Sequence, residues 1–377
     1  MGPIRVGIIG VAGQSSAQYT PGEWGVHHLR AVLANTRYEL TAICNSTVES
    51  ASRSIAFHQL DANKVRAYGS VADLAADPQV DLVVVAVDAS KHVQLAQPVI
   101  EAGKDVYVEF PLAPNLKECE QLTQLAKDVG VKSIAGTQAH SDPALAKLRY
   151  LVENEIGKIV STVLVGTSPI DSSAGWPASA ATFLSVDGYA SRIRIVNGHV
   201  LGGFSSVVGQ FEDLQAVYKT QSPTTTLLDD KFQPVKTNYP VTSPDHVGIQ
   251  GVLRSGALAS IHFRVTAAPV DDCGFRWIIS GTAGEAELVT KPGFFQTGLD
   301  GAVIRLRKRG EEASKEVDWD TGYSDAVAAV DGWTKSIARV YAAFAEGRES
   351  EYATLETALE VHRTLDKATA GALWASK

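Results

Sequence analysis

Short apolar runs rich in β-branched residues alternate with amphipathic stretches through residues 4–136, and this alternation constrains the fold more than any other feature. The runs are IRVGII, YELTAIC, VDLVVVAV, KDVYVEF and VKSIAG. Strands that alternate with helical stretches are typical of βαβ units, in which each helix carries the chain back so that the next strand pairs in parallel. We therefore expect a doubly wound parallel sheet of five or six strands.

A second pattern begins at Lys158. Longer segments of alternating polar and apolar residues, separated by glycine turns, predict a large, mostly antiparallel open sheet with one solvated face. Residues 220–244 are rich in Pro and Thr and indicate a long loop or flap. Helical spacing then returns in a stripe that includes Trp333. We expect an α/β domain over residues 1–140 and an α+β domain over residues 141–377, with the C-terminal helices packing back toward the first.

Composition and charge limit the class of protein. The 377 residues are 45% apolar and 20% charged, which is enough for two cores. Lys and Arg total 34 against 42 Asp and Glu, and no run of like charge would follow a phosphate backbone, so we expect no direct nucleic-acid partner. The apolar stretch at the N-terminus is too short for a signal peptide or a membrane span. With three cysteines that lack metal-type spacing, we expect a cytoplasmic protein with reduced thiols and no metal site.

The first apolar run ends in a turn of small residues, GVAGQS. Such residues let backbone amides approach a pyrophosphate where a strand turns into a helix, and the helix N-terminus adds roughly half a positive charge. The spacing departs from Gly-x-Gly-x-x-Gly, so a glycine-rich turn without a ligand is the alternative. The next segment, QYTPGEWG, could shield a cofactor or contact a substrate. We assign cofactor contacts in the turn to Gly10, Ala12, Gly13, Gln14 and Ser15.

The second run ends in CNST, where an NAD-specific site commonly places Asp or Glu on the ribose 2′-hydroxyl. No acid stands here. Asn45 and Ser46 could donate to a 2′-phosphate, together with Thr47, and Arg53 follows one or two helical turns later. We therefore favour NADP(H) and keep NAD(H) as possible. The alternative, in which Ser46 or Thr47 caps a helix, is compatible with either coenzyme.

The fourth and fifth runs end in VDASKH and in EFP. Ligands of open parallel sheets bind beyond the carboxyl ends of the strands, so both tips and the glycine turn should face one crevice. We assign cofactor contacts at these tips to Val87, Asp88, His92, Glu109 and Phe110. Phe110 raises a question, because an aromatic ring cannot move a proton.

These motifs, in this order, resemble the glucose-fructose oxidoreductase and inositol dehydrogenase (Gfo/Idh/MocA) family. Over nearly all its length the chain is most similar to the fungal branch that contains the galactose-pathway repressor. The resemblance implies a Rossmann-type dinucleotide-binding domain, followed by a domain for substrate binding and dimerisation. The motifs that carry it are GIIGVAGQ, VDASKH, VEFPL and FRWIISGTAGE, together with VNGH at 196–199 and SPDHVGIQGVLRSG at 243–256.

The resemblance also shows what this chain lacks. Family enzymes usually carry Lys where this chain has Phe110, and that Lys holds the substrate hydroxyl and helps to move its proton. They commonly carry acids at the positions of Ile195 and Gly202, whereas the family His is present as His199. A positioned acid or base contributes on the order of 10²–10⁴-fold to a rate, so its loss needs a substitute.

Candidates for that substitute are few. His199 is the first, since the ordinary pKa of histidine suits proton transfer. Tyr189 and His140 are weaker candidates for catalysis, with Arg194 beside them. Phe110 could stack on the nicotinamide or an apolar substrate. The resemblance places Glu109 and His92 along the cofactor pocket, and we add Gln138 to the cofactor set.

Three functions follow from this set. The first is an NAD(P)-dependent oxidoreductase that acts on a carbonyl or alcohol of a sugar-like or secondary-metabolite substrate. The second is a non-catalytic sensor that binds a dinucleotide and a transcription-factor segment, for which the missing Lys needs no replacement. The third is a redox-neutral lyase or isomerase. We also expect a homodimer, formed through the face of the antiparallel sheet that the helices leave uncovered.

Overall fold

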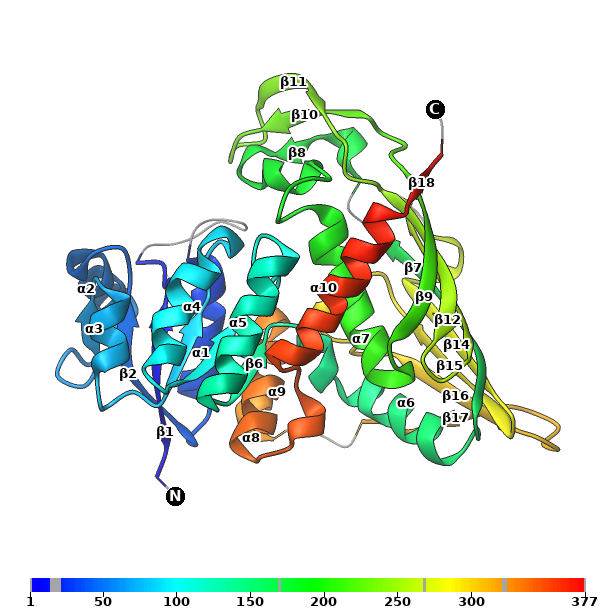
Figure 1. The fold of residues 1–377 in the computed structure, drawn as a ribbon, viewed down its shortest axis with the longest axis horizontal. Coiled ribbons are helices and arrows are strands. Elements are labelled where there is room, and N and C mark those ends of the chain that lie inside the picture. The colour runs from blue at the N-terminus through cyan, green and yellow to red at the C-terminus, as the bar shows by residue number, and fades with distance from the viewer. Residues whose placement is uncertain (1, 14–21, 169–170, 267–268, 321–323, 376–377) are drawn as a thin grey trace. The chain divides into compact units, whose positions relative to one another are not determined.

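The computed structural model describes residues 2–13, 22–168, 171–266, 269–320 and 324–375 (Figure 1). The chain divides into two compact units. The first unit comprises residues 1–141 and 323–359, and the second comprises residues 142–322 and 360–377. Each unit is thus built from two separate segments of the sequence.

The first unit contains a six-stranded parallel sheet in the order β3-β2-β1-β4-β5-β6. The chain runs outward from β1 to β3 and then returns to β4, which pairs with β1 on its other side. This arrangement confirms the predicted doubly wound sheet, and ligands in such sheets bind where the strand order reverses. The strands are β1 (Ile4–Ile9), β2 (Tyr38–Cys44), β3 (Arg66–Tyr68), β4 (Leu82–Val85), β5 (Asp105–Val108) and β6 (Ser133–Ala135).

Helices of the first unit begin at polar caps. Thr47, Ser70 and Asn115 each accept a hydrogen bond from a backbone N–H in the first turn of the helix that follows. The helices are α1 (Glu23–Ala34), α2 (Val48–Phe57), α3 (Val71–Ala76), α4 (His92–Glu101), α5 (Leu116–Val129), α8 (Asp325–Ala328) and α9 (Gly332–Ala345), with single 3₁₀ turns at Ala89–Lys91, Gln138–Ser141 and Glu349–Glu351.

The core of the first unit joins segments that are far apart in the sequence. Helix α9 packs against α1, and both contribute buried side chains to the cluster that covers β1 and β2. Tyr38 on β2 donates its hydroxyl to the carbonyl of Tyr341 on α9 at 2.7 Å. Because this contact spans the unit from its N-terminal to its C-terminal part, α9 belongs to the same folded body as the sheet.

The second unit contains a nine-stranded sheet in the order β17-β16-β15-β14-β7-β13-β12-β9-β18. Its pairs are antiparallel, except that β13 pairs in parallel with β7, and β18 pairs in parallel with β9. The predicted mostly antiparallel sheet is confirmed. The strands are β7 (Ile159–Ser168), β9 (Phe211–Lys219), β12 (His246–Leu253), β13 (Leu258–Val265), β14 (Phe275–Gly281), β15 (Gly284–Thr290), β16 (Val303–Lys308), β17 (Lys315–Val317) and β18 (Leu373–Trp374).

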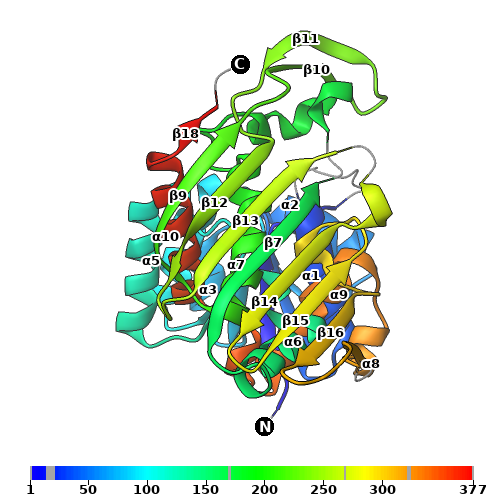
Figure 2. The ribbon, with the colours of Figure 1, turned by 90° about the vertical axis from the view of Figure 1, so that its right-hand side faces the viewer.

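One face of this sheet is packed and the other is open. Figure 2 shows the open face, with α6 (Pro143–Asn154) and α7 (Gly198–Val208) behind the strands. On the packed face, Phe204 of α7 stacks on Trp277 of β14, and the indole N–H of Trp277 donates to Thr162 Oγ1 at 2.8 Å. Helix α10 (Leu355–Ala370) also belongs in part to this unit.

A small three-stranded sheet occupies the segment that we expected to be a loop. Residues Thr224–Leu228 form β10 and Pro234–Pro240 form β11, and β10 also pairs in parallel with β8 (Trp176–Pro177). The carboxylate of Asp229 accepts hydrogen bonds from the backbone N–H groups of Lys231 and Gln233, which closes the turn. The run TTTLL favours a strand because Thr is β-branched and fits a pleated sheet. The prediction of a loop gave too much weight to the prolines of this segment.

Within the parts of the chain that the structure describes, no helix is both long and apolar enough to cross a lipid bilayer. All three cysteines are free, and burial raises the pKa of the Cys44 thiol to about 11. The short helical elements of the second unit are Ser172–Ala174, Ala178–Leu184, Val270–Asp272 and Phe295–Thr297, together with a π-helical turn at Ile193–Asn197.

Candidate functional site

The turn after β1 can be built only with glycine at its first position. Gly10 has φ +93°, and a Cβ there would lie 2.4 Å from Val87 Cγ1 and 2.7 Å from the carbonyl oxygen of Ala86. Its N–H donates to the carbonyl of Cys44 at 3.0 Å, which ties the turn to the end of β2. The turn therefore lies at the carboxyl edge of the sheet, between the tips of β2 and β4.

Two further glycines complete this turn from beyond residues 14–21. A Cβ on Gly25 would lie 1.9 Å from the carbonyl oxygen of Gly10. Gly22 has φ +83° and precedes α1, and its carbonyl accepts a hydrogen bond from Ala12 N at 3.1 Å. In the Gly-x-Gly-x-x-Gly fingerprint, the third glycine lets the helix pack closely against the strand. In this chain Gly25 has that role.

The sequence predicted that all residues of the turn would follow one another in the chain, from Gly10 to Ser15. Gln14 and Ser15, two of the predicted cofactor contacts, lie outside the described residues. The signal that would have found Gly25 is the spacing Gly-x-x-Gly, from Gly22 to Gly25, immediately before an apolar helix. The dinucleotide fingerprint of this chain is therefore split, with its two halves joined through Ala12 and Gly22.

Asn45, at the tip of β2, holds the glycine turn in place. Its Oδ1 accepts from Val11 N at 3.0 Å, while its Nδ2 donates to Val11 O at 3.0 Å and to Ser54 Oγ at 2.9 Å. These bonds use the amide in both directions, so Asn45 acts on the backbone of the turn. Ser46 and Arg53 are exposed beside it. Thr47 caps α2, as the alternative interpretation of this segment expected.

His92 connects the tips of β4 and β5. Its ring is buried, with Nδ1 2.8 Å from the carbonyl oxygen of Pro111 and Nε2 3.1 Å from that of Val87. Burial lowers the pKa of His92, so the neutral ring has one N–H and donates to one of the two carbonyls at a time. Asp88, next to Val87, accepts a hydrogen bond from Ser90 N at 3.0 Å and so shapes the same tip.

A buried polar cluster lies directly after β5. Glu109 Oε1 is 2.9 Å from His28 Nε2, and Gln138 Nε2 lies 3.0 and 3.1 Å from the two carboxylate oxygens of Glu109. His28 Nδ1 is 2.9 Å from the hydroxyl of Tyr341. A Cβ on Gly136 would lie 2.4 Å from Glu109 Oε2, so the neighbouring strand must carry glycine there. We name Glu109, His28, Gln138 and Tyr341 the Glu109 cluster.

The structure brings two predicted residues together and adds His28, for which the sequence predicted no role at the site. Glu109 and Gln138 were both predicted cofactor contacts. His28 is fully buried on α1, and its role depends on partners from β5 and α9 that no local pattern reveals. Burial raises the pKa of both Tyr107 and Tyr341 well above the ordinary value of tyrosine, so these hydroxyls stay protonated beside the carboxylate.

Phe110 follows Glu109 and is joined to Pro111 by a cis peptide bond. Its side chain is buried and apolar. The ring stands where the resemblance places a Lys, so this position supplies contact surface and no proton.

The remaining catalytic candidates divide between the two units. His140 lies on the 3₁₀ turn after β6, in the first unit. Tyr189 and His199 lie in the second unit, where His199 is the second residue of α7 and is buried. Arg194 forms an ion pair with Asp366 of α10 at 2.9 Å, which engages its charge.

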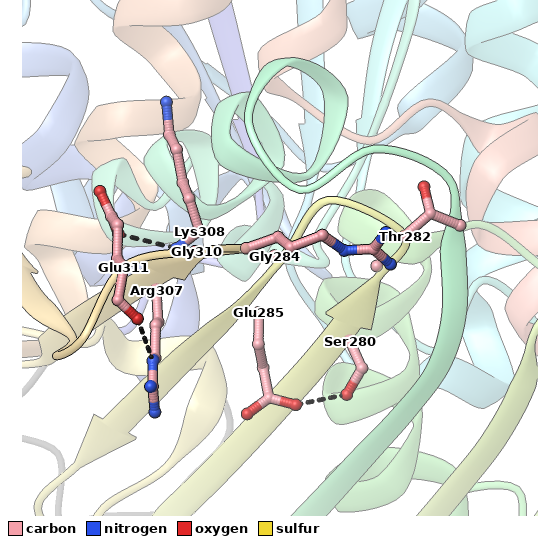
Figure 3. A pocket seen from close by; sticks show the side chains of 10 residues that line it. Ser280, Thr282, Gly284, Glu285, Arg307, Lys308, Gly310 and Glu311 are labelled. Atoms are coloured by element: carbon pink, nitrogen blue, oxygen red, sulfur yellow. Dashed lines mark hydrogen bonds between the residues drawn. The ribbon is translucent and has the colours of Figure 1, made fainter.

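A hollow on the second unit, of about 380 Å³, lies among the turns at the ends of β14, β15 and β16 (Figure 3). Ser280 Oγ donates to Glu285 Oε2 at 2.6 Å, and Arg307 Nε donates to the carbonyl of Glu311 at 3.1 Å. Lys308 is paired with Glu155. The polar side chains of this hollow thus bond mainly to one another and to neighbouring backbone, as in a solvated strand end.

No set of three or more His, Cys, Asp or Glu side chains among the described residues is arranged to hold a metal ion. The glycine turn, in contrast, has the close backbone packing of a dinucleotide fingerprint, because a Cβ at Gly10 would meet Val87 and Ala86, and a Cβ at Gly25 would meet the carbonyl oxygen of Gly10.

Comparison with known proteins places the chain among oxidoreductases with a Rossmann fold. Residues 4–137 match the family described as an oxidoreductase family with an NAD-binding Rossmann fold, and residues 143–290 match the C-terminal domain of Gal80p. The dehydrogenase aclE of Aspergillus oryzae is 31% identical over 290 residues, which cover 76% of this chain and 76% of the relative. The chain belongs to the Gfo/Idh/MocA oxidoreductase family. The predicted family resemblance is confirmed.

Other members of the Gfo/Idh/MocA family that resemble this chain differ in role. The galactose/lactose metabolism regulatory protein GAL80 of Kluyveromyces lactis is 25% identical over 313 residues, covering 78% of this chain and 65% of the relative. A crystal structure of a super-repressor mutant of Gal80p from Saccharomyces cerevisiae matches with a TM-score of 0.82 at 21% identity, over 98% of this chain and 96% of that one.

A structure of levoglucosan dehydrogenase in complex with NADH and levoglucosan matches with a TM-score of 0.72 at 18% identity, over 98% of this chain and 96% of that one. At these identities the solved structures establish the shared fold. Relatives of this chain in sequence thus include a protein named as a dehydrogenase and a protein named as a regulator.

Proposed function

We propose that this chain is an NADP(H)-dependent oxidoreductase that acts on a carbonyl or alcohol of a sugar-like or secondary-metabolite substrate. The observation that carries the proposal is the split glycine turn, in which Gly10 and Gly25 leave no room for a Cβ at the carboxyl edge of the sheet. Membership of an oxidoreductase family with dehydrogenase relatives supports it.

Chain elements at this edge would hold the coenzyme. The glycine turn, with Gly10, Ala12, Gly13, Gln14 and Ser15, and the N-terminus of α1 would receive the pyrophosphate. When bound, the coenzyme supplies hydride transfer. The protein then has to orient the substrate and handle one proton.

The tip of β2 supports a preference for NADP(H). Asn45, Ser46 and Thr47 carry no charge, and the exposed Arg53 lies on the helix that follows. An acid at this tip would repel a 2′-phosphate. We therefore expect Ser46→Asp to weaken NADPH binding by about tenfold and to leave NADH binding nearly unchanged. Equal loss for both coenzymes, measured by fluorescence titration, would remove the basis for this preference.

His199 is the proposed proton carrier, and Tyr189 and His140 are alternatives. Phe110 would shape an apolar surface beside the nicotinamide, while Val87, Asp88, His92, Glu109 and Gln138 would form the wall of the coenzyme site. The Glu109 cluster supports this assignment, since His28 and the amide of Gln138 fix the carboxylate that immediately precedes Phe110.

The test is turnover with a panel of carbonyl substrates, followed as loss of NADPH absorbance. We expect His199→Ala to lower kcat/KM by roughly 10²–10⁴-fold. The matched variant Phe110→Leu keeps an apolar side chain and should retain turnover. A His199→Ala protein as active as the wild type would move the proton transfer to another residue.

A non-catalytic regulator is the second candidate. Two observations favour it: Phe110 replaces the family Lys, and residues 143–290 match the C-terminal domain of Gal80p. The same experiment separates the two functions. A regulator would bind NADPH tightly, turn over none of the panel, and bind a synthetic acidic activation segment of a transcription factor. An oxidoreductase would give substrate-dependent oxidation.

We also propose a homodimer that forms through the open face of the nine-stranded sheet. Exposed apolar side chains on strands of this sheet support this assignment, among them Val163 on β7, Val217 on β9 and Val252 on β12. Light scattering at increasing concentration should give twice the chain mass, and Val163→Asp with Val217→Asp should lower it. A wild-type protein that stays monomeric at high concentration would contradict the dimer.

A further inference from the structure

One buried cation of the second unit has no anionic partner. The guanidinium of Arg192, immediately before the π-helical turn, is 5% exposed. Its Nη1 donates to Ser172 Oγ at 3.3 Å and its Nη2 donates to the carbonyl of Ser243 at 3.0 Å. Within the described part of the chain it forms no ion pair, and its Nε–H has no hydrogen-bond acceptor.

Ser243, whose carbonyl binds Arg192, also has a side-chain donor without a partner in the part of the chain that the structure describes. The side chain is fully buried, and its Oγ has no hydrogen-bond partner among the described residues. The backbone of Ser243 is fixed, since its N–H donates to the carbonyl of Leu184 and its carbonyl accepts from Arg192. Two donors on adjoining residues are therefore buried and unused, although buried polar groups in folded proteins nearly always have partners.

The acids of this region are already engaged. The carboxylate of Asp245 accepts hydrogen bonds from the N–H groups of Gln221 and Ser222 and lies 2.8 Å from His246 Nδ1. Asp171 accepts from Ser173 N at 2.8 Å and from Ser173 Oγ at 2.7 Å. Neither acid pairs with Arg192, so the positive charge is not compensated from within the described chain.

A buried guanidinium without an anionic partner is unfavourable, because it loses its hydration and gains no ion pair in exchange. Burial accordingly lowers the pKa of Arg192, against the attraction of Asp245 and Asp171. The face of the guanidinium lies 5.6 Å from the ring centre of Trp176, which offers a cation–π contact and no negative charge. A ligand that brings one negative charge and two acceptor oxygens would satisfy both unused donors.

We propose that Arg192 and Ser243 form a binding site for the carboxylate of a small molecule. One carboxylate oxygen would accept from Arg192 Nε and the other from Ser243 Oγ, with a single negative charge opposite a single guanidinium. A carboxylate matches this site better than phosphate, whose further oxygens would find no donors among the unused groups. Because both donors are buried, a small molecule fits the site better than the side chain of a bulky peptide.

The cover of this site can open locally. Trp176 belongs to a cluster of only five buried apolar residues, which lies apart from the main cores of the molecule. Strand β11 beside it is almost entirely exposed. Segments with so few buried contacts open at a small fraction of the global stability, so a small carboxylate has a route to Arg192.

The test uses the full chain without coenzyme, titrated with acetate at constant ionic strength against chloride, and follows the midpoint of thermal unfolding. We expect a saturable rise in the wild type. Arg192→Met should abolish the rise, and Ser243→Ala should require roughly tenfold more acetate, which corresponds to the loss of one hydrogen bond to a charged group. Arg309→Met, which removes the same charge from an exposed strand end, should respond as the wild type does.

Two results would overturn the proposal. The first is a wild-type midpoint that acetate shifts no more than it shifts that of Arg192→Met, as expected if internal water satisfies the two donors. The second is an equal response of Ser243→Ala and the wild type. If Arg192→Met fails to fold, Arg192→Lys replaces it, because it keeps the charge and loses the Nε donor. This test needs no turnover, so its outcome is separate from that of the proposed oxidoreductase activity.

Discussion

The Glu109 cluster of the first unit and the Arg192 site of the second unit are both buried and polar, but they differ in how their groups are paired. Glu109 is held by His28 and Gln138, and His28 in turn contacts Tyr341. Arg192 has two weak neutral partners and leaves its Nε–H unused. The first region satisfies its charge with its own side chains, whereas the second does not.

This difference separates a scaffold from a binding site. The Glu109 cluster leaves Gln138 Oε1 without a partner among the described residues, but its carboxylate is held by two side chains, and each displacement of these would break a buried hydrogen bond. Donors left without partners gain free energy when a ligand supplies the acceptors. We therefore expect substitutions in the first region to lower stability, and substitutions around Arg192 to lower ligand binding.

The largest effect should come from the backbone that supports the first region. Gly25→Ala places a Cβ 1.9 Å from the carbonyl oxygen of Gly10, so α1 must move away from β1. We expect a loss of about 3 kcal/mol of unfolding free energy, measured by urea denaturation, together with loss of NADPH binding. Gly293→Ala is the control, since a Cβ there meets nothing within 4 Å. If the two variants had the same unfolding free energy and bound NADPH equally well, the turn would accommodate a Cβ at Gly25 without cost.

Breaking the Glu109 cluster should have the next largest effect. His28→Leu removes one of the two side chains that hold Glu109 and leaves the carboxylate buried with Gln138 alone. Loss of a hydrogen bond to a buried carboxylate costs about 1.5–3 kcal/mol, so the urea midpoint should fall clearly. If His28→Leu proved as stable as the wild type, the cluster would not be the rigid scaffold that the comparison assumes.

Acid should affect the second unit through its buried histidine. Burial, with a smaller contribution from Arg194, lowers the pKa of His362 to about 3, below the ordinary value of 6.5. Between these values the unfolded chain binds the proton and the folded chain does not, so stability falls as the pH falls, by up to about 1.4 kcal/mol per pH unit. His362→Gln should flatten this dependence between pH 6 and pH 4, and parallel curves for the two proteins would contradict it.

The smallest change in stability should come from Arg192→Met in the absence of carboxylates. This substitution leaves no buried acid unpaired and leaves two neutral acceptors on Ser172 and Ser243. We expect a loss of about 1 kcal/mol or less, in contrast with His28→Leu. A loss as large as that of His28→Leu would show that Arg192 is a structural link of the same kind, and the comparison would fail.

Local patterns predict the framework of this molecule well. The β-branched runs give the strands of both sheets, and the stripe that includes Trp333 gives α9, because each pattern reflects the burial of one face. The short strands β8 and β10 were missed, since their pairing joins residues about fifty positions apart.

The polar sites are less predictable for the same reason. Glu109 was predicted from its place at the edge of the sheet and from the family resemblance, and Gln138 was added to the cofactor set. His28 reaches Glu109 only through the packing of α1, and Gly25 is separated from Gly10 by residues 14–21. Arg192 carries no sequence signal, because its lack of a partner is a property of the folded surroundings.

Binding of a dinucleotide at the split glycine turn can be measured without any substrate, by a fluorescence titration of NADPH and NADH with the full chain and with Gly25→Ala. We expect saturable binding of at least one coenzyme, tighter for NADPH, and loss of binding in Gly25→Ala. Absence of binding of both coenzymes to a folded wild-type protein would contradict binding at this turn.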